Sequence, residues 1–121
     1  MRILRHHIAA LAVALCGCAA DLQPMALSVA DVAQVKQAVT RQLKDPESAR
    51  FGPIVGGKDA TGRSYACGVV NAKNSFGGYT GDKPFVVKVE DGPAGRTFDP
   101  IVIGGADVDT ATASMACGNI L

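Results

Sequence analysis

The chain has 121 residues, of which 48% are hydrophobic, but it contains no Trp, two Tyr and four Phe. This length predicts one small domain with a core of aliphatic side chains and little margin of stability. Twelve Lys and Arg residues balance eleven Asp and Glu residues, and both signs are interspersed, so the basic surface that nucleic-acid binding requires is missing.

The first seventeen residues are typical of an export signal. Arg2 and Arg5 make the start basic, and an uninterrupted apolar run follows over residues 8–15. A basic start, a short apolar core and then small residues define a secretory signal peptide. A membrane-spanning helix needs about 20 apolar residues, so we expect this segment to direct export without spanning the bilayer.

The end of this segment, Leu15-Cys16-Gly17-Cys18, resembles the lipobox of bacterial lipoproteins. In that motif an aliphatic residue and a small residue precede an acylated Cys, although Cys16 departs from the small residues usual at its position. The resemblance implies a lipid on Cys18, anchorage in the cell envelope and, through Ala19, sorting to an outer membrane if the host has one. The alternative is ordinary cleavage after Ala19 or Ala20, which would release a soluble protein.

This interpretation divides the chain into a signal peptide (residues 1–17), a lipidated Cys with its tether (residues 18–27) and one small α+β domain (residues 28–121). Both histidines, His6 and His7, lie in the signal. A mature chain without His cannot use a Ser-His-Asp or Cys-His mechanism, nor imidazole as a zinc ligand. We therefore assign no catalytic residues, no metal site and no cofactor.

The domain is predicted to begin with a helix. Ser28, followed three residues later by Asp31, forms a box-like N-terminus. One apolar stripe of the predicted helix contains Val29, Val32, Val35, Val39 and Leu43. The polar face is not strongly cationic, so we expect the stripe to pack on a core rather than on a membrane surface. The helix should end near Asp45-Pro46, because Pro disfavours helical geometry in the residue before it.

The following segments alternate as strands do, over residues 65–70, 85–90 and 98–103. Residues 51–55 contain Gly52 and Pro53 and fit only an edge strand, and residues 56–62 read as a turn region. Residues 106–116 can form a short helix. The predicted fold is therefore α+β: a small antiparallel sheet of three to four strands, an N-terminal amphipathic helix packed on it and a possible short C-terminal helix. In the first strand, Tyr65, Cys67 and Val69 are predicted to face inward.

Cys67 and Cys117 are the two cysteines that remain after processing and lipidation. In an oxidising compartment we expect them to form a disulfide. The alternative, a redox-active or metal-binding pair, lacks the close Cys-x-x-Cys spacing of such sites.

One connection between predicted strands stands out. Residues 71–81 read Asn-Ala-Lys-Asn-Ser-Phe-Gly-Gly-Tyr-Thr-Gly. Together with residues 43–51 and Pro84-Phe85, the stretch 67–81 resembles an uncharacterised family of small exported bacterial proteins. That family has the pattern Leu-Lys-Asp-Pro-x-Ser-Ala-x-Phe, followed by Cys-Gly-x-Val-Asn-Ala-Lys-Asn-Ser-x-Gly-Gly-Tyr-x-Gly. The resemblance covers about half of the mature chain and implies a shared fold, but it brings no activity with it.

The 71–81 loop has two interpretations. In the structural one, its glycines permit tight turns, Asn74 caps a turn, and Phe76 and Tyr79 fold back over a thin core. In the functional one, the two aromatic residues are rigid anchors for a protein or glycan, with polar contacts from Asn71, Lys73 and Asn74. The structural interpretation is the stronger from sequence alone, because a thin domain needs loop aromatics in its core.

The function that fits these observations is a lipid-anchored cell-envelope protein, on the outer membrane or a periplasmic face, acting as a non-catalytic binding or accessory module. Its expected partners are the membrane, through Cys18, and an envelope protein or glycan. The alternative is an enzyme acting on cell-wall glycan through paired carboxylates. The carboxylates considered for that role are Glu90, Asp91, Asp107 and Asp109.

Overall fold

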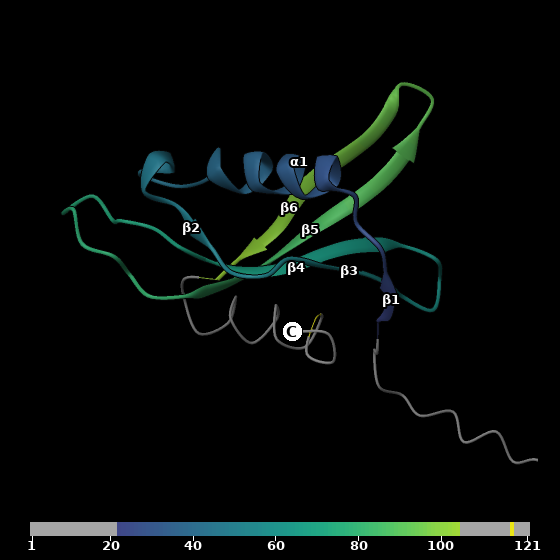
Figure 1. The fold of residues 1–121 in the computed structure, drawn as a ribbon, viewed down its shortest axis with the longest axis horizontal. Coiled ribbons are helices and arrows are strands. Elements are labelled where there is room, and N and C mark those ends of the chain that lie inside the picture. Colours follow the sequence, from purple (N-terminus) through teal and green to yellow (C-terminus); the bar gives the residue numbers. More distant parts are fainter. Residues whose placement is uncertain (1–21, 105–116, 118–121) are drawn as a thin grey trace, which may run out of the picture.

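The computed structural model describes residues 22–104 and residue 117. In this part of the chain, one α-helix lies across a twisted antiparallel sheet (Figure 1). The elements are β1 (Gln23–Met25), α1 (Val29–Thr40), the 3-10 helix η1 (Pro46–Ser48), β2 (Arg50–Phe51), β3 (Val55–Lys58), β4 (Ser64–Asn71), β5 (Lys83–Gly92) and β6 (Gly95–Ile103).

The strand order is β1-β3-β4-β5-β6, and the two-residue β2 also pairs with β4. Because β2 pairs with the end of β4 at Asn71 and Val70 while β3 pairs with its beginning, the two short strands share one edge of β4. Gly52 continues the edge through a hydrogen bond from its N–H to the Val69 carbonyl (3.0 Å).

The predicted sheet of three to four strands was therefore wrong: the sheet has six strands, and it dominates the described fold. The strand β1 lies inside the stretch read as tether, and β3 begins the stretch read as a turn. A Cβ on Gly56 would lie 2.5 Å from the Met25 carbonyl oxygen, so this glycine permits close pairing of β1 with β3 rather than a turn. The predicted C-terminal helix, residues 106–116, lies outside the described residues.

The helix α1 begins as its sequence pattern indicates. Ser28 Oγ accepts a hydrogen bond from the Asp31 N–H, and the Asp31 carboxylate accepts one from the Ser28 N–H, each at 3.0 Å. This confirms the capping box. Arg96 then donates to the same carboxylate at 3.0 Å, which ties the start of the helix to β6. The helix ends at Thr40, earlier than predicted, and Pro46 opens the separate turn η1.

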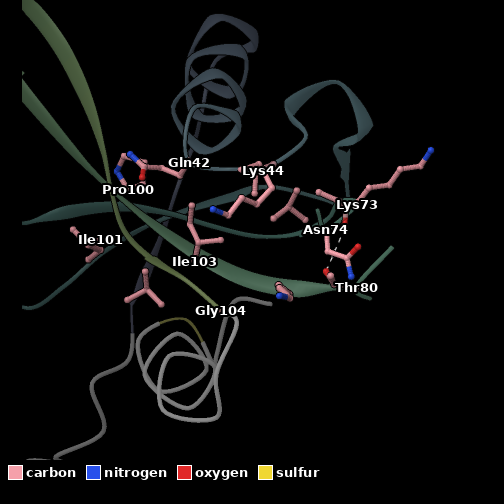
Figure 2. A pocket seen from close by; sticks show the side chains of 14 residues that line it. Gln42, Lys44, Lys73, Asn74, Thr80, Pro100, Ile101, Ile103 and Gly104 are labelled. Carbon is pink, nitrogen blue, oxygen red and sulfur yellow. Dashed lines mark hydrogen bonds between the residues drawn. The ribbon is translucent and has the colours of Figure 1, made fainter. Parts of the chain in front are cut away.

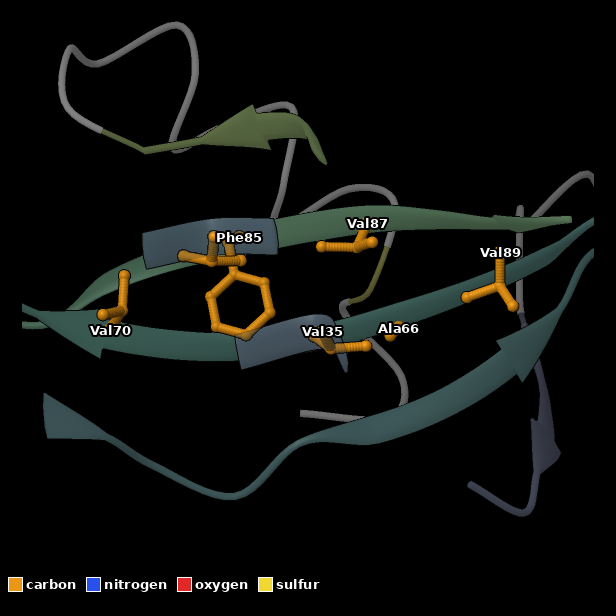
Figure 3. Packing of buried hydrophobic residues seen from close by; sticks show 7 residues of the cluster. Val35, Ala66, Val70, Phe85, Val87 and Val89 are labelled. Atoms are coloured by element: carbon orange, nitrogen blue, oxygen red, sulfur yellow. The ribbon is translucent and has the colours of Figure 1, made fainter. Parts of the chain in front are cut away.

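The main core lies between α1 and one face of the sheet (Figure 3). It consists of Val35, Val39, Ala66, Val70, Phe85, Val87 and Val89. The Phe85 ring passes over β4 at Gly68, where a Cβ would lie 2.6 Å from the ring, and it meets Phe51 edge-on at a centroid distance of 5.9 Å. A glycine in the middle of a strand therefore makes room for the largest core side chain.

A second apolar cluster covers the opposite face of the sheet. The Cys67–Cys117 disulfide lies at its centre, with a Cα–Cα distance of 6.0 Å, and both cysteines are fully buried beside Leu22 and Val86. The disulfide prediction is thus confirmed. Tyr65, Cys67 and Val69 were predicted to face inward, and Cys67 is fully buried, but in this second cluster. The alternate set, with Ala66 and Val70, faces α1. Both faces of β4 are covered, so alternation alone did not identify the helix side.

Candidate functional site

The 71–81 loop extends the β4–β5 hairpin beyond the end of the sheet (Figure 1). The two arms of the loop remain paired. Lys73 and Tyr79 form an isolated antiparallel bridge, the Thr80 N–H donates to the Ala72 carbonyl (3.2 Å), and the Asn74 N–H donates to the Gly78 carbonyl (2.8 Å). The loop is therefore a continuation of the hairpin with a tight tip.

Two asparagine side chains hold the tip together. Asn74 Oδ1 accepts hydrogen bonds from the N–H groups of Phe76 (2.9 Å) and Gly78 (3.2 Å). Between them, Gly77 has φ +83°, a backbone conformation that favours glycine. Asn71 Oδ1 accepts from the Gly81 N–H (3.0 Å). The carbonyl oxygens of both side chains are thus engaged inside the loop, where they fix its backbone.

Tyr79 anchors the base of the loop to η1. Its hydroxyl donates to the Ser48 carbonyl (3.1 Å), and the Lys73 N–H donates to Ser48 Oγ (2.8 Å). The ring lies 4.3 Å from the Arg50 guanidinium and 5.6 Å from the Lys73 ammonium, measured to the ring centroid. Cations at these distances are attracted to an aromatic face. The ring is still 37% exposed, so it forms part of a cationic surface.

Phe76 behaves differently. It lies at the tip of the loop and is 97% exposed. The interpretation in which Phe76 and Tyr79 cover the core was therefore wrong: Phe76 contacts no core, and Tyr79 packs against η1 instead. The structure brings Lys73 and Tyr79 together at the base of the loop and places Phe76 alone at its end.

Two of the carboxylates considered for an enzyme acting on glycan, Glu90 and Asp91, lie in the described part of the chain, and both form ion pairs on the surface. Glu90 binds the Lys88 ammonium (2.7 Å) and Asp91 binds the Arg96 guanidinium (2.7 Å). The hydrogen bond from Arg96 lowers the pKa of Asp91 below its ordinary value, whereas a general acid needs a raised pKa. Asp107 and Asp109, like Cys18, lie outside the described residues. The described geometry thus lends no support to carboxylate catalysis.

One feature was missed from the sequence: a pocket of about 470 Å³ at the base of the loop (Figure 2). It is lined by residues that follow α1, by the loop, and by β4, β5 and β6. Among its lining residues are Leu43, Lys44, Val70, Lys83 and Ile103. Four separated segments form it, and no local pattern in any one of them predicts it.

Within residues 22–104 and at Cys117, no cluster of three or more His, Cys, Asp or Glu side chains could hold a metal ion. In the same part of the chain, no helix is long and apolar enough to cross a membrane.

Comparisons with protein-family models, with curated proteins and with solved structures give no match for this chain. The candidate site consequently rests on its own geometry. The resemblances to bacterial lipoproteins and to the small exported family remain predictions.

Proposed function

We propose that the protein is a non-catalytic binding module of the bacterial cell envelope, tethered to a membrane by lipid on Cys18. In this proposal the 71–81 loop recognises an envelope protein or glycan. The single observation that carries it is the 97% exposure of Phe76 on a loop whose backbone is held by Asn74 and Asn71.

An exposed aromatic residue on a fixed backbone is well suited to binding. Burying a Phe side chain against a partner is worth about 1.5–3 kcal/mol, and aromatic residues often dominate the energy of an interface. Because Asn74 already orders the tip, little conformational entropy is lost on association. At the base of the loop, Tyr79 with Arg50 and Lys73 adds a polar, cationic border.

The Cys67–Cys117 disulfide supports export, since such bonds persist in oxidising compartments. The membrane tether has its own test. In cells fed labelled palmitate, the native chain should incorporate label and fractionate with membranes, whereas Cys18→Ser should do neither. If Cys18→Ser is released from the membrane but still incorporates label, Cys18 is not the attachment site.

Partner recognition is tested by a photo-crosslinking amino acid at position 76 in intact cells of the host. Val29 was predicted to pack on the core with the rest of the apolar stripe, but this was wrong: it is 89% exposed at the start of the helix. It therefore provides a matched apolar control position. A discrete crosslink from position 76 that position 29 does not give would identify the partner. Phe76→Ala should then weaken binding of that partner at least tenfold, and Val29→Ala should leave it unchanged. Identical products from both positions, or full binding by Phe76→Ala, would refute the proposal.

A further inference from the structure

We infer that the pocket at the base of the 71–81 loop binds a small amphipathic anion, namely a carboxylate that carries a short apolar tail. The pocket shares Lys73 and Asn74 with the 71–81 loop but includes neither Phe76 nor Tyr79. A ligand in the pocket would therefore be held without Phe76, on which the partner proposed above depends.

The floor of the pocket is apolar. Val70 is 2% exposed and Ala72 is 9% exposed, while Leu43 and Ile103 are half-buried beside the main core. The volume of about 470 Å³ falls in the range of about 300–1,000 Å³ typical of small-molecule sites. Because Val70 and Ala72 are already almost fully buried, an aliphatic tail laid on this floor would remove apolar surface from water mainly at Leu43 and Ile103.

The rim is cationic. Lys44, Lys73 and Lys83 line the pocket, and none of the described lining residues is Asp or Glu. Figure 2 shows the Lys44 side chain directed across the pocket and the Lys73 side chain directed away from it. Since the Lys73 ammonium is also near the Tyr79 ring, the positive charge available to a ligand comes from Lys44 and Lys83.

The position of Lys44 has a simpler explanation, because a cation near the C-terminal end of a helix interacts favourably with the helix dipole. That explanation does not extend to Lys83, which begins β5 and pairs with Val70 of the floor. Two lysines from separate elements over one apolar floor match a ligand that has both an anionic group and an apolar part. A small inorganic anion would leave the floor wet, and a neutral alkane would leave the ammonium groups unmatched.

The test uses octanoate, below the concentration at which it forms micelles, and residues 18–121 with Cys18→Ser, exported behind an ordinary secretion leader. Amide shifts in NMR should map binding to the pocket. Octanol has the tail without the charge, and butyrate has the charge with a much shorter tail, so both should bind more weakly than octanoate. Raising the salt concentration should weaken octanoate binding. Lys44→Gln and Lys83→Gln should each raise the dissociation constant about two- to fivefold. Lys58→Gln is the matched control on the exposed part of β3, away from this pocket, and should leave the constant unchanged.

Three outcomes would overturn the inference: octanol binding as tightly as octanoate, equal effects of the three Lys variants, or shifts that map elsewhere. A fourth concerns the chain itself, since Asp107 and Asp109 follow Gly104 closely in sequence. If octanoate binds only when both are replaced by Asn, the lysines serve the chain's own carboxylates and no external ligand. Loss of Phe76 recognition would leave octanoate binding intact, so the two proposals fail separately.

Discussion

Replacing both Cys67 and Cys117 by Ala should remove a large share of the stability of the domain. The disulfide closes a loop with a sequence separation of 50 residues. In the chain-entropy model a loop of this length restricts the unfolded state by about 4 kcal/mol. The total unfolding free energy of a domain is about 5–15 kcal/mol, so the double variant should be close to the limit of folding.

The effect should be larger than the entropy alone predicts, because both cysteines are fully buried in the second cluster. Without the bond, the cover that Cys117 provides over that face of the sheet is no longer held by a covalent link. For a domain of this size, 4 kcal/mol corresponds to a fall in Tm of roughly 15–30 °C.

The assay is urea unfolding of residues 18–121 carrying Cys18→Ser, followed by circular dichroism with and without reductant. The native sequence should lose at least about 4 kcal/mol on reduction, and its m-value should rise because the reduced unfolded chain exposes more surface. The free energy of unfolding of the double Ala variant should be close to that of the reduced protein, and adding reductant should not change it. A loss below about 1 kcal/mol in both would refute this reasoning, since the stated entropy would then be absent.

Three further predictions concern single residues. Asn74→Ala removes the acceptor for two loop N–H groups, so hydrogen exchange at Phe76 should accelerate while global stability hardly changes; unchanged protection there would contradict the role of the side chain. The pKa of Asp31 lies below its ordinary value of 3.8, chiefly because the Ser28 N–H donates to the carboxylate. A lowered folded-state pKa contributes stability above the unfolded pKa, and this stability is lost as the pH falls through the folded value. The unfolding free energy of Asp31→Asn should therefore fall less steeply between pH 2 and pH 4 than that of the native chain, and equal slopes would argue against this role. Gly68→Ala places a Cβ 2.6 Å from the Phe85 ring and should cost about 1–3 kcal/mol in urea unfolding, whereas an unchanged midpoint would show that the ring moves freely.

The parts of the fold that were predictable from sequence depend on neighbours along the chain. Ser28 and Asp31 specify the helix start within one turn, and alternation marks β4, β5 and β6. The short strands β1 and β3 were missed because Pro24 and Gly56 are residues of tethers and turns when each is read alone. Only the pairing of the two strands explains them, and pairing over 30 residues leaves no local pattern.

The same distinction applies to the site. The turn-forming roles of Asn74 and Gly77 follow from their intrinsic preferences. The direction of Phe76 does not, because it depends on how two hydrogen bonds to Asn74 Oδ1 orient the tip. Tyr79 was recognised as important, but its partner Ser48 lies 31 residues away, and the pocket combines still more distant segments.

The position of β1 limits how far the sheet could lie from a lipid attached to Cys18. Gln23 begins the outermost strand of the sheet, five positions after Cys18. Even fully extended, the segment from Cys18 to Gln23 would span no more than about 18 Å. In Figure 1 this edge lies at one end of the long axis of the molecule and the 71–81 loop at the other. A chain lipidated at Cys18 would be held with its sheet edge close to the bilayer and its aromatic tip pointing outward, so its partners would be sought across the gap from the membrane rather than along it.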